Sequence, residues 1–393
     1  MAAKGADKSA QRFLSVQLEN WRNFRSVDLS LESRAFFVGP NASGKTNLLD
    51  ALRFLHDLVD EGGGFRESVK RRGGVKGLRA LAARRQPSIM VRVSIGASND
   101  QSAWVYELRF TSDNRGRPLI ERELVLSGSK SVLDRPDKED KDDPERLTQT
   151  YLEQVHANRR FREIADFLEQ VRFLHIVPQI IREPDRGVGR VDDPYGGDFL
   201  EQIAKTNART REARLRHVKE ALRIAVPQLE DLVLARDAKG TPHLQGKYRH
   251  WRPRGAWQSE ERFSDGTLRL LGLLWAVLSG GGPLLLEEPE LSLHPEVVRF
   301  IPQMLARVQR KSGRQVLLST HSSDLLHDEG IGLGEVFLLE PSEEGTEVLA
   351  AREYADIQAL LDGDVSLGEA VMARTRPEWA EQLMLFGGGN GAK

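Results

Sequence analysis

Two kinds of apolar pattern follow each other along the chain. Residues 13–38 first alternate apolar and polar positions and then become continuously apolar, which predicts two half-exposed strands and one buried strand. Residues 47–59 have helical spacing. In the C-terminal third, helical stretches alternate with short apolar strands, at 266–279, 283–287, 295–311, 315–320 and 335–340. This alternation predicts a parallel sheet flanked by helices.

The middle of the chain has a different pattern. Three amphipathic strands are predicted at 88–96, 103–111 and 118–127. Helices are predicted at 145–156, 159–170 and 199–225, with strands at 171–177, 229–235 and 243–249. Residues 134–145 hold seven acids around two prolines, which favours a solvated, mobile loop.

Composition limits the possible functions. The 57 basic and 58 acidic side chains nearly cancel, so any contact with nucleic acid must come from a local patch. Cysteine is absent, which excludes disulfides, cysteine zinc sites and iron–sulfur clusters. The first twelve residues have no apolar core, and no apolar run is long enough to span a bilayer. We therefore expect a soluble cytoplasmic protein with no membrane partner.

The strongest chemical motif is a phosphate loop. Residues 39–46 read Gly-Pro-Asn-Ala-Ser-Gly-Lys-Thr, which matches G-x-x-x-x-G-K-[ST], and they lie between a predicted strand and a predicted helix. Backbone N–H groups of such a loop turn toward phosphate oxygens. The predicted ATP contacts are Gly39, Asn41, Ser43, Gly44, Lys45, Thr46 and Asn47. Lys45 should reach the β and γ phosphates, and Thr46 should bind Mg²⁺. The alternative is a glycine-rich turn with a surface lysine.

Two acids end the apolar strand at 283–287. The carboxyl ends of parallel strands meet at the edge where open α/β sheets bind ligands. Glu287 is the candidate for holding Mg²⁺, and Glu288 is the candidate for activating the attacking water. The two acids could instead belong to an ordinary helix start before Pro289.

Three further residues occupy positions that suit an ATP site. Ser264 and Gly266 open a predicted helix, where free N–H groups form an anion site, although Ser264 would also suit a simple N-cap. We refer to residues 264–266 as the signature motif. His321 follows a buried strand and is a candidate partner of the γ-phosphate, or else a structural histidine. Gln179, after the strand at 171–177, is a candidate contact of Mg²⁺ and the attacking water.

Two basic stretches could contact nucleic acid. Residues 66–85 hold eight cations and one acid, and residues 247–254 interleave four cations with Tyr248 and Trp251. Charge combined with aromatic rings suits a nucleic-acid backbone and its bases. A solvated face or a protein-binding surface remains an equal alternative.

Together these motifs resemble the RecF-like and SMC-like branch of ABC ATPases, in particular short ATPases related to the OLD proteins. The resemblance is carried by residues 18–26, the loop at 39–47, the signature at 264–269, the acids through Pro295, and Thr320-His321-Ser322. It implies an ABC-type α/β head with a mixed sheet and an inserted α/β lid region. The expected division is an N-terminal head part (1–60), an inserted region (61–260) and a C-terminal head part (261–393).

The sequence departs from these relatives in three places. Glu287 stands where many ABC proteins have aspartate. Residues 180–263 are too few for the long coiled coil of SMC proteins. Only 72 residues follow His321, so we expect no counterpart of the TOPRIM nuclease domain of OLD proteins in this sequence. Asp362-Gly363-Asp364 lies in a glycine turn and is interpreted as structural.

The resemblance implies a function, with alternatives. The leading expectation is an ATPase that binds ATP and Mg²⁺, forms a homodimer or higher oligomer through ATP-sandwiched heads, and regulates a separate effector such as a nuclease or toxin in bacterial anti-phage defence. The alternative is a RecF-like DNA-repair ATPase that binds DNA. A transporter subunit is disfavoured because residues 47–263 are long for a transporter cassette.

Overall fold

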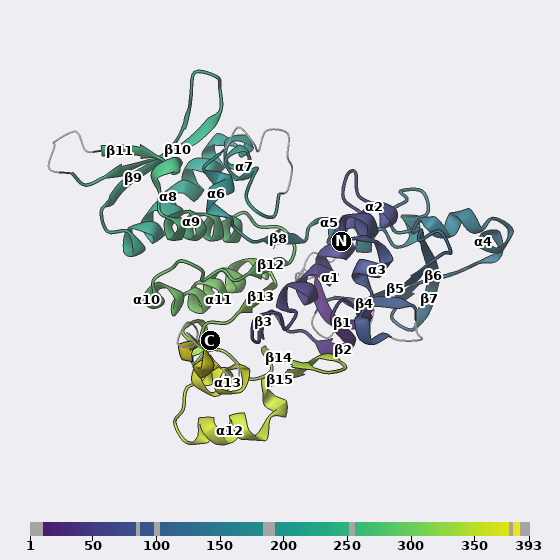
Figure 1. Ribbon diagram of the computed structural model, residues 1–393. Coiled ribbons are helices and arrows are strands. Elements are labelled where there is room, and N and C mark those ends of the chain that lie inside the picture. The colour runs from purple at the N-terminus through teal and green to yellow at the C-terminus, as the bar shows by residue number, and fades with distance from the viewer. Residues whose placement is uncertain are drawn as a thin grey trace, which may run out of the picture.

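The computed structural model describes residues 11–83, 87–97, 103–183, 193–250, 256–376 and 380–385. Within these ranges the chain forms three sheets, with strand orders β15-β14-β3-β13-β12-β8, β2-β1-β4-β5-β6-β7 and β11-β10-β9 (Figure 1). Among the described residues, no helix has both the length and the apolar character of a membrane span.

The first of these sheets is mixed and lies at the centre of the molecule (Figure 1). Its strands are β3 (Arg34–Val38), β8 (Arg172–Leu174), β12 (Leu284–Glu287), β13 (Val316–Thr320), β14 (Val336–Ser342) and β15 (Gly345–Ala350). Only the β14–β15 pair is antiparallel among the described strands of this sheet. The central strands β3, β12 and β13 are apolar on both faces because helices and the second sheet cover them, and Phe36, Leu285 and Leu317 are fully buried.

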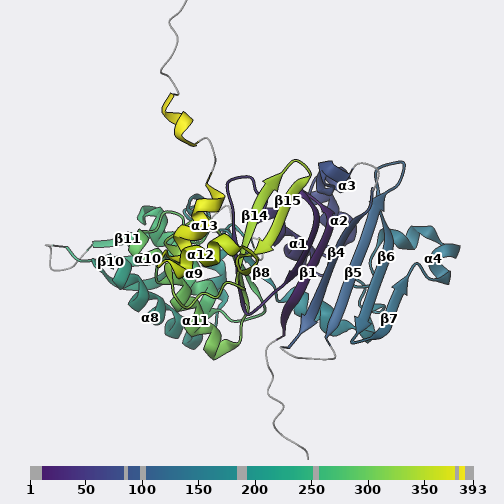
Figure 2. The ribbon, with the colours of Figure 1, turned by 90° about the horizontal axis from the view of Figure 1, so that it is seen from below.

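The second sheet is antiparallel and half-exposed (Figure 2). It contains β1 (Arg12–Trp21), β2 (Phe24–Ser30), β4 (Ile89–Gly96), β5 (Trp104–Ser112), β6 (Pro118–Ser127) and β7 (Lys130–Arg135). Near it are α1 (Lys45–Asp57), α2 (Phe65–Arg71), α3 (Gly74–Leu78), α4 (Lys138–Asp142) and α5 (Arg162–Glu169). Alternating burial along β1 turns one face to a core that α1 and α5 share.

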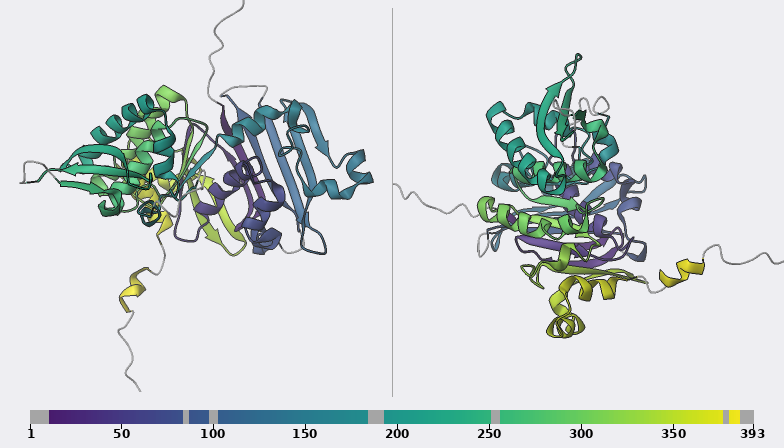
Figure 3. Two further views of the ribbon diagram at one scale, coloured as in Figure 1. Left: turned by 90° about the horizontal axis from the view of Figure 1, so that it is seen from above. Right: turned by 90° about the vertical axis from the view of Figure 1, so that its left-hand side faces the viewer.

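A helical lobe carries the signature motif. It combines α6 (Pro178–Ile181), α7 (Phe199–Lys205), α8 (Ala208–Ala225) and α9 (Asp265–Leu278) with β9 (Leu229–Arg236), β10 (Pro242–Tyr248) and β11 (Ala256–Ser259). Ile203, Val218 and Leu271 are fully buried in the core of this lobe. Figure 3 shows the lobe at the opposite end of the mixed sheet from α12 (Ala355–Asp362) and α13 (Leu367–Thr375).

The C-terminal helices cover the other part of the mixed sheet. They are α10 (Pro295–Val298), α11 (Ile301–Ser312), α12 (Ala355–Asp362) and α13 (Leu367–Thr375). Their buried residues, such as Leu305, Ile357 and Val371, pack with Leu318 and Leu338 of the sheet. The fold class predicted from the sequence, an α/β head with a mixed sheet, is confirmed by these layers.

Several local predictions are wrong. The acidic stretch 134–145 is an ordered unit, because the fully buried Arg135 donates to Asp140 (2.7 Å) and to Glu123 (2.9 Å). The predicted helix 145–156 is a 3₁₀ helix (Pro144–Thr148) followed by turns. The predicted helices 199–225 and 295–311 are each divided in two. In the first, Asn207 breaks the helix by capping α8 with its side chain.

Candidate nucleotide-binding site

The phosphate loop connects β3 to α1 in the way that the sequence predicts. Gly44 precedes α1 in a left-handed conformation, with φ of 97°. A Cβ atom at this position would also lie only 2.2 Å from the Asn23 side chain. Glycine is therefore required at position 44 both by the backbone conformation and by the available space.

Lys45 is held against its own loop. Its Nζ donates to the carbonyl oxygens of Gly39 (2.8 Å) and Pro40 (3.0 Å), and the side chain is buried. Burial lowers the pKa of the Lys45 ammonium, while the charges of three nearby glutamates oppose this shift. The loop therefore holds the Lys45 ammonium where phosphate oxygens would be stronger hydrogen-bond acceptors than the two carbonyl oxygens.

Asn23 supports the phosphate loop, although it belongs to none of the predicted site motifs. Its amide donates to Ser43 O (2.8 Å) and to Thr346 Oγ1 (2.7 Å), and its oxygen accepts from Asn47 Nδ2 (2.8 Å). Asn47 thus stabilises the phosphate loop through its hydrogen bond to Asn23. Position 23 falls within the segment that resembles RecF-like proteins, which is the only sequence feature that could have indicated its role.

The predicted site residues lie close together at the carboxyl ends of three neighbouring strands. Register pairs Glu287 of β12 with Ser319 of β13, and Thr320 with Val38 of β3. The hydroxyl of Thr46 donates directly to Glu287 Oε1. One hydroxyl and one carboxylate suit Mg²⁺, which binds through one or two protein oxygens and takes phosphates and waters for the remainder.

Glu288 and His321 face each other beside this pair. Glu288 leaves the strand with φ of 43°, and its N–H donates to Ser319 O at 3.1 Å. Glu288 Oε1 lies 3.2 Å from His321 Nδ1. The carboxylate is thus held at the sheet edge with an imidazole next to it, an arrangement that can accept a proton from water.

Glu290 is a further residue that sequence reasoning did not select. It accepts from Thr320 Oγ1 (2.6 Å) and from the His321 N–H (3.3 Å), and burial raises the pKa of its carboxyl group. These bonds fix the backbone that carries His321. The sequence placed Glu290 within the acid segment, but only the structure shows which groups it holds.

The signature motif opens α9 but does not join the phosphate loop of its own chain. Ser264 Oγ accepts from the Thr267 N–H at 3.2 Å, so the capping role is present. A Cβ atom on Gly266 would lie 2.4 Å from Ser292 O, so a side chain does not fit there. Among the described residues, no hydrogen bond links Ser264 or Gly266 to Lys45 or Thr46.

Gln179 lies on the signature side of the site. Its Nε2 is 3.5 Å from Asp265 Oδ2, and Arg182, which directly follows α6, donates to Asp265 Oδ1 at 2.6 Å. Side chains of α6 and of the residue after it thus hold the first residue of α9. A contact between Gln179 and Mg²⁺ stays a prediction.

The basic stretches are only partly available to a ligand. The side chain of Arg72 is 6% exposed and pairs with Asp50 and Asp57, each at 2.8 Å, so this cation is already neutralised within the protein and its contact with nucleic acid stays a prediction. Lys247 pairs with Glu230 at 3.2 Å. The other predicted cations and rings at Arg84, Arg85, Trp251, Arg252 and Arg254 lie outside the described residues. Arg66, Lys70 and Lys76 are exposed.

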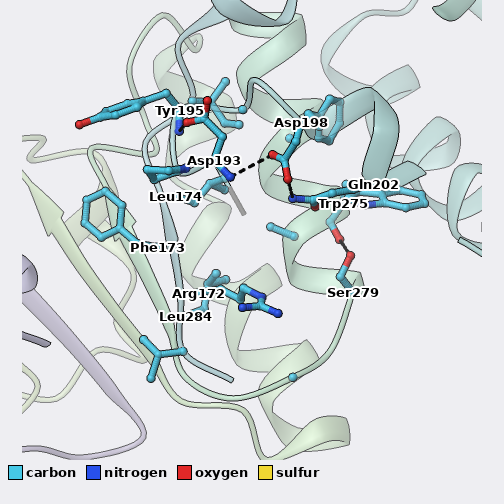
Figure 4. A pocket seen from close by; sticks show the side chains of 18 of the residues that line it. Arg172, Phe173, Leu174, Asp193, Tyr195, Asp198, Gln202, Trp275, Ser279 and Leu284 are labelled. Carbon is cyan, nitrogen blue, oxygen red and sulfur yellow. Dashed lines mark hydrogen bonds between the residues drawn. The ribbon is translucent and has the colours of Figure 1, made fainter. Parts of the chain in front are cut away.

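A cavity of about 1110 Å³ lies beside the edge strand β8 and away from the phosphate loop. The start of β8, the end of α9 and α7 contribute to its walls (Figure 4). Arg214 and Arg314 in its lining donate to backbone carbonyls at the end of α9 and just after it. Cations are favourable at a helix C-terminus, so both arginines have a structural role.

Comparison with known proteins agrees with this fold. Residues 34–328 match the family described as "AAA domain, putative AbiEii toxin, Type IV TA system". The crystal structure of an Smc head bound to the C-winged helix domain of ScpA has a TM-score of 0.54 at 12% identity, over 86% of this chain and 97% of that chain. An Smc head with an extended coiled coil, bound to the C-terminal domain of ScpA derived from Pyrococcus furiosus, has a TM-score of 0.51 at 12% identity, over 90% of this chain and 100% of that chain. At this identity the likeness shows the fold alone.

One curated protein shares a short segment with this chain. Endonuclease GajA from Bacillus cereus (strain VD045) is 40% identical over 57 residues. The shared segment is 14% of this chain and 10% of GajA, so the chain spans only a small part of that protein's length.

Proposed function

Because the chain belongs to the AAA-domain family that matches residues 34–328, with the head fold of the RecF/SMC-like ABC ATPases, we propose that it binds and hydrolyses ATP. The observation that carries this proposal is the contact between Thr46 and Glu287, with Lys45 on the adjoining loop. ATP would occupy the loop through the groups of residues 39–47. Mg²⁺, when bound, would neutralise phosphate charge beside Thr46 and Glu287.

The proposed reaction uses the two residues at the sheet edge. The oxygen of a water bonds to the γ-phosphorus, the bond to the ADP oxygen breaks, and Glu288 takes the water's proton. His321 would donate from its second ring nitrogen to a γ-phosphate oxygen while Nδ1 stays near Glu288, as the 3.2 Å separation suggests. Lys45 would leave its two carbonyl acceptors for the β and γ phosphates.

We further propose that two heads share each ATP. The N-terminus of α9 offers N–H groups for an anion, and its described bonds lead to α6 and α9 itself. A face-to-face dimer with C₂ symmetry would place each signature motif on the γ-phosphate of the other subunit. Higher oligomers could be built from the same pair.

The biological role is proposed as a class of function, without a named effector. We propose a bacterial anti-phage ATPase that regulates an effector such as a nuclease or toxin, and the short segment shared with an endonuclease is the observation that supports this role. The Smc heads bound to ScpA domains are a precedent for a partner subunit that docks on such a head. A cytoplasmic location and the division into 1–60, 61–260 and 261–393 remain part of this proposal.

Removing the charge of Lys45 tests ATP binding directly. We expect Lys45→Ala to weaken the binding of a fluorescent ATP analogue by about tenfold or more, because a charge-assisted hydrogen bond to phosphate is lost. Arg314→Lys, at a buried cation outside the site, serves as the control and should bind the analogue normally. Equal affinity for Lys45→Ala and the unmodified protein would contradict the assignment of the loop.

The RecF-like alternative predicts DNA binding through exposed cations. The triple variant Arg66→Glu, Lys70→Glu and Lys76→Glu should then abolish binding, and affinity should fall steeply with salt. Reversing Arg307, Arg310 and Lys311 on α11 changes the net charge equally and should leave binding intact. Fluorescence anisotropy with duplex and single-stranded DNA measures this. Absence of binding with ATP present would favour the effector role.

A further inference from the structure

His175 lies next to Glu287 at the edge of the site. It directly follows β8, whose Leu174 pairs in register with Leu286 of β12. The backbone N–H of His175 donates to Pro194 O at 2.8 Å, which fixes the position of the His175 backbone. The imidazole is therefore carried to the carboxyl end of the sheet, where parallel strands bring their ligands together.

The side chain of His175 has an unusual environment. Its Nδ1 atom is closed off from solvent and forms no hydrogen bond with any described residue. The ring contacts Tyr195 edge-on, with centroids 6.1 Å apart. Nδ1 lies 3.6 Å from Glu287 Oε2, while Oε1 of the same carboxylate accepts from Thr46. A buried polar atom without a partner is costly, so a missing partner is expected.

A simple hydrogen bond does not account for this geometry. The separation of 3.6 Å exceeds the range of a hydrogen bond between nitrogen and oxygen. Two ligands of one cation, each about 2.1 Å from it, lie about 3–4 Å apart. Thr46, Glu287 and His175 then supply one hydroxyl, one carboxylate and one imidazole on the same side of the site.

We propose that His175 Nδ1 is a ligand of the divalent cation, together with Thr46 and Glu287. This inference rests on the proposed ATPase function, because the nucleotide's phosphates would complete the coordination. Imidazole suits transition metals, whereas Mg²⁺ takes oxygen ligands, so the site should select Mn²⁺ over Mg²⁺ more strongly than an all-oxygen site does. His175 then lies on the metal side of the site, whereas Gln179 lies beside Asp265 of the signature motif.

The test uses Mn²⁺ as a spectroscopic probe. The full-length protein is loaded with Mn²⁺ and AMP-PCP, an analogue that is not hydrolysed and has no nitrogen close to the metal. Pulsed EPR should detect coupling of Mn²⁺ to a ¹⁴N nucleus, and labelling the histidines with ¹⁵N should shift that coupling without any substitution. His175→Phe keeps a ring against Tyr195 and should lose the coupling, with Mn²⁺ affinity about tenfold lower. Mg²⁺ affinity should change less.

His321→Phe is the matched control, because it removes the other imidazole near the site and should keep the coupling. Coupling that persists in His175→Phe, or that is absent from the unmodified protein while Mn²⁺ and AMP-PCP are bound, would overturn the inference and leave the ATPase proposal standing. If neither protein bound the Mn²⁺ nucleotide, the proposed function would itself be wrong, and the metal role of His175 with it.

Discussion

Replacing Glu288 with glutamine is expected to lower ATP turnover about a thousandfold while ATP still binds. The amide has the same shape but cannot take a proton from the attacking water. The structure holds this side chain at the end of β12, where its Oε1 lies 3.2 Å from His321 Nδ1. Phosphate release under saturating ATP measures the loss, and binding of a fluorescent ATP analogue shows that the site is intact.

Glu290→Gln is the matched control for this result. Glu290 is two residues away, and its Oε1 accepts from Thr320 and from the His321 N–H. An amide oxygen can still accept both bonds, so the rate should fall far less than in Glu288→Gln. If Glu288→Gln hydrolysed ATP as fast as the unmodified protein, the proton acceptor would have to be another group.

A second large effect is expected at the signature motif. Ser264→Arg should abolish ATP-dependent dimerisation, because a bulky cation at the start of α9 would occupy the place of the other subunit's γ-phosphate. ATP binding to the separate subunit should change by less than about threefold, since Ser264 has no described bond to its own phosphate loop. Light scattering with ATP, in a Glu288→Gln background, measures the mass.

Loss of the helix cap alone does not predict this outcome, and Asn207→Arg separates the two effects. Asn207 caps α8 in the same lobe, where its side chain accepts from the Arg209 N–H. Removing either cap costs about 1 kcal/mol of stability. Asn207→Arg should therefore be destabilised by a similar amount and still dimerise. A Ser264→Arg protein that dimerises normally with ATP would contradict the shared site.

The mixed sheet could be predicted because its apolar strands and the functional residues at their ends are adjacent in the sequence. The run Leu284–Glu287 is apolar and then acidic, and the strand before His321 is uniformly buried. Parallel pairing alone is enough to bring Glu287 beside Ser319 and Thr320 beside Val38. The loop at 39–46 could be identified from its sequence motif, and Gly44 has the left-handed conformation that such a loop needs.

The supporting residues could not be predicted because their partners are distant in sequence. Asn23 contacts Ser43 and also Thr346, which lies 323 residues further along the chain. His175 meets Glu287 only because β8 pairs with β12. No sequence pattern marks either contact.

Charge patterns were misleading for a related reason. The stretch 134–145 has the composition of a solvated loop, yet Arg135 is fully buried between Glu123 and Asp140. A buried cation with two carboxylate partners is stable, but the sequence does not show which acid folds inward. The same holds for Arg72, whose partners Asp50 and Asp57 belong to α1.

The measurement that tests the shared ATP site most directly is the ATPase rate of a mixture of Lys45→Ala and Ser264→Arg proteins. Each variant alone should be inactive, because every site that two of its copies could form lacks either an intact phosphate loop or an intact signature motif. Half of the dimers in an equal mixture pair the two variants, and one of their two sites is intact, so the mixture should recover up to about one quarter of the unmodified rate. A mixture as inactive as its components, or a Ser264→Arg protein that is fully active as a monomer, would contradict the account.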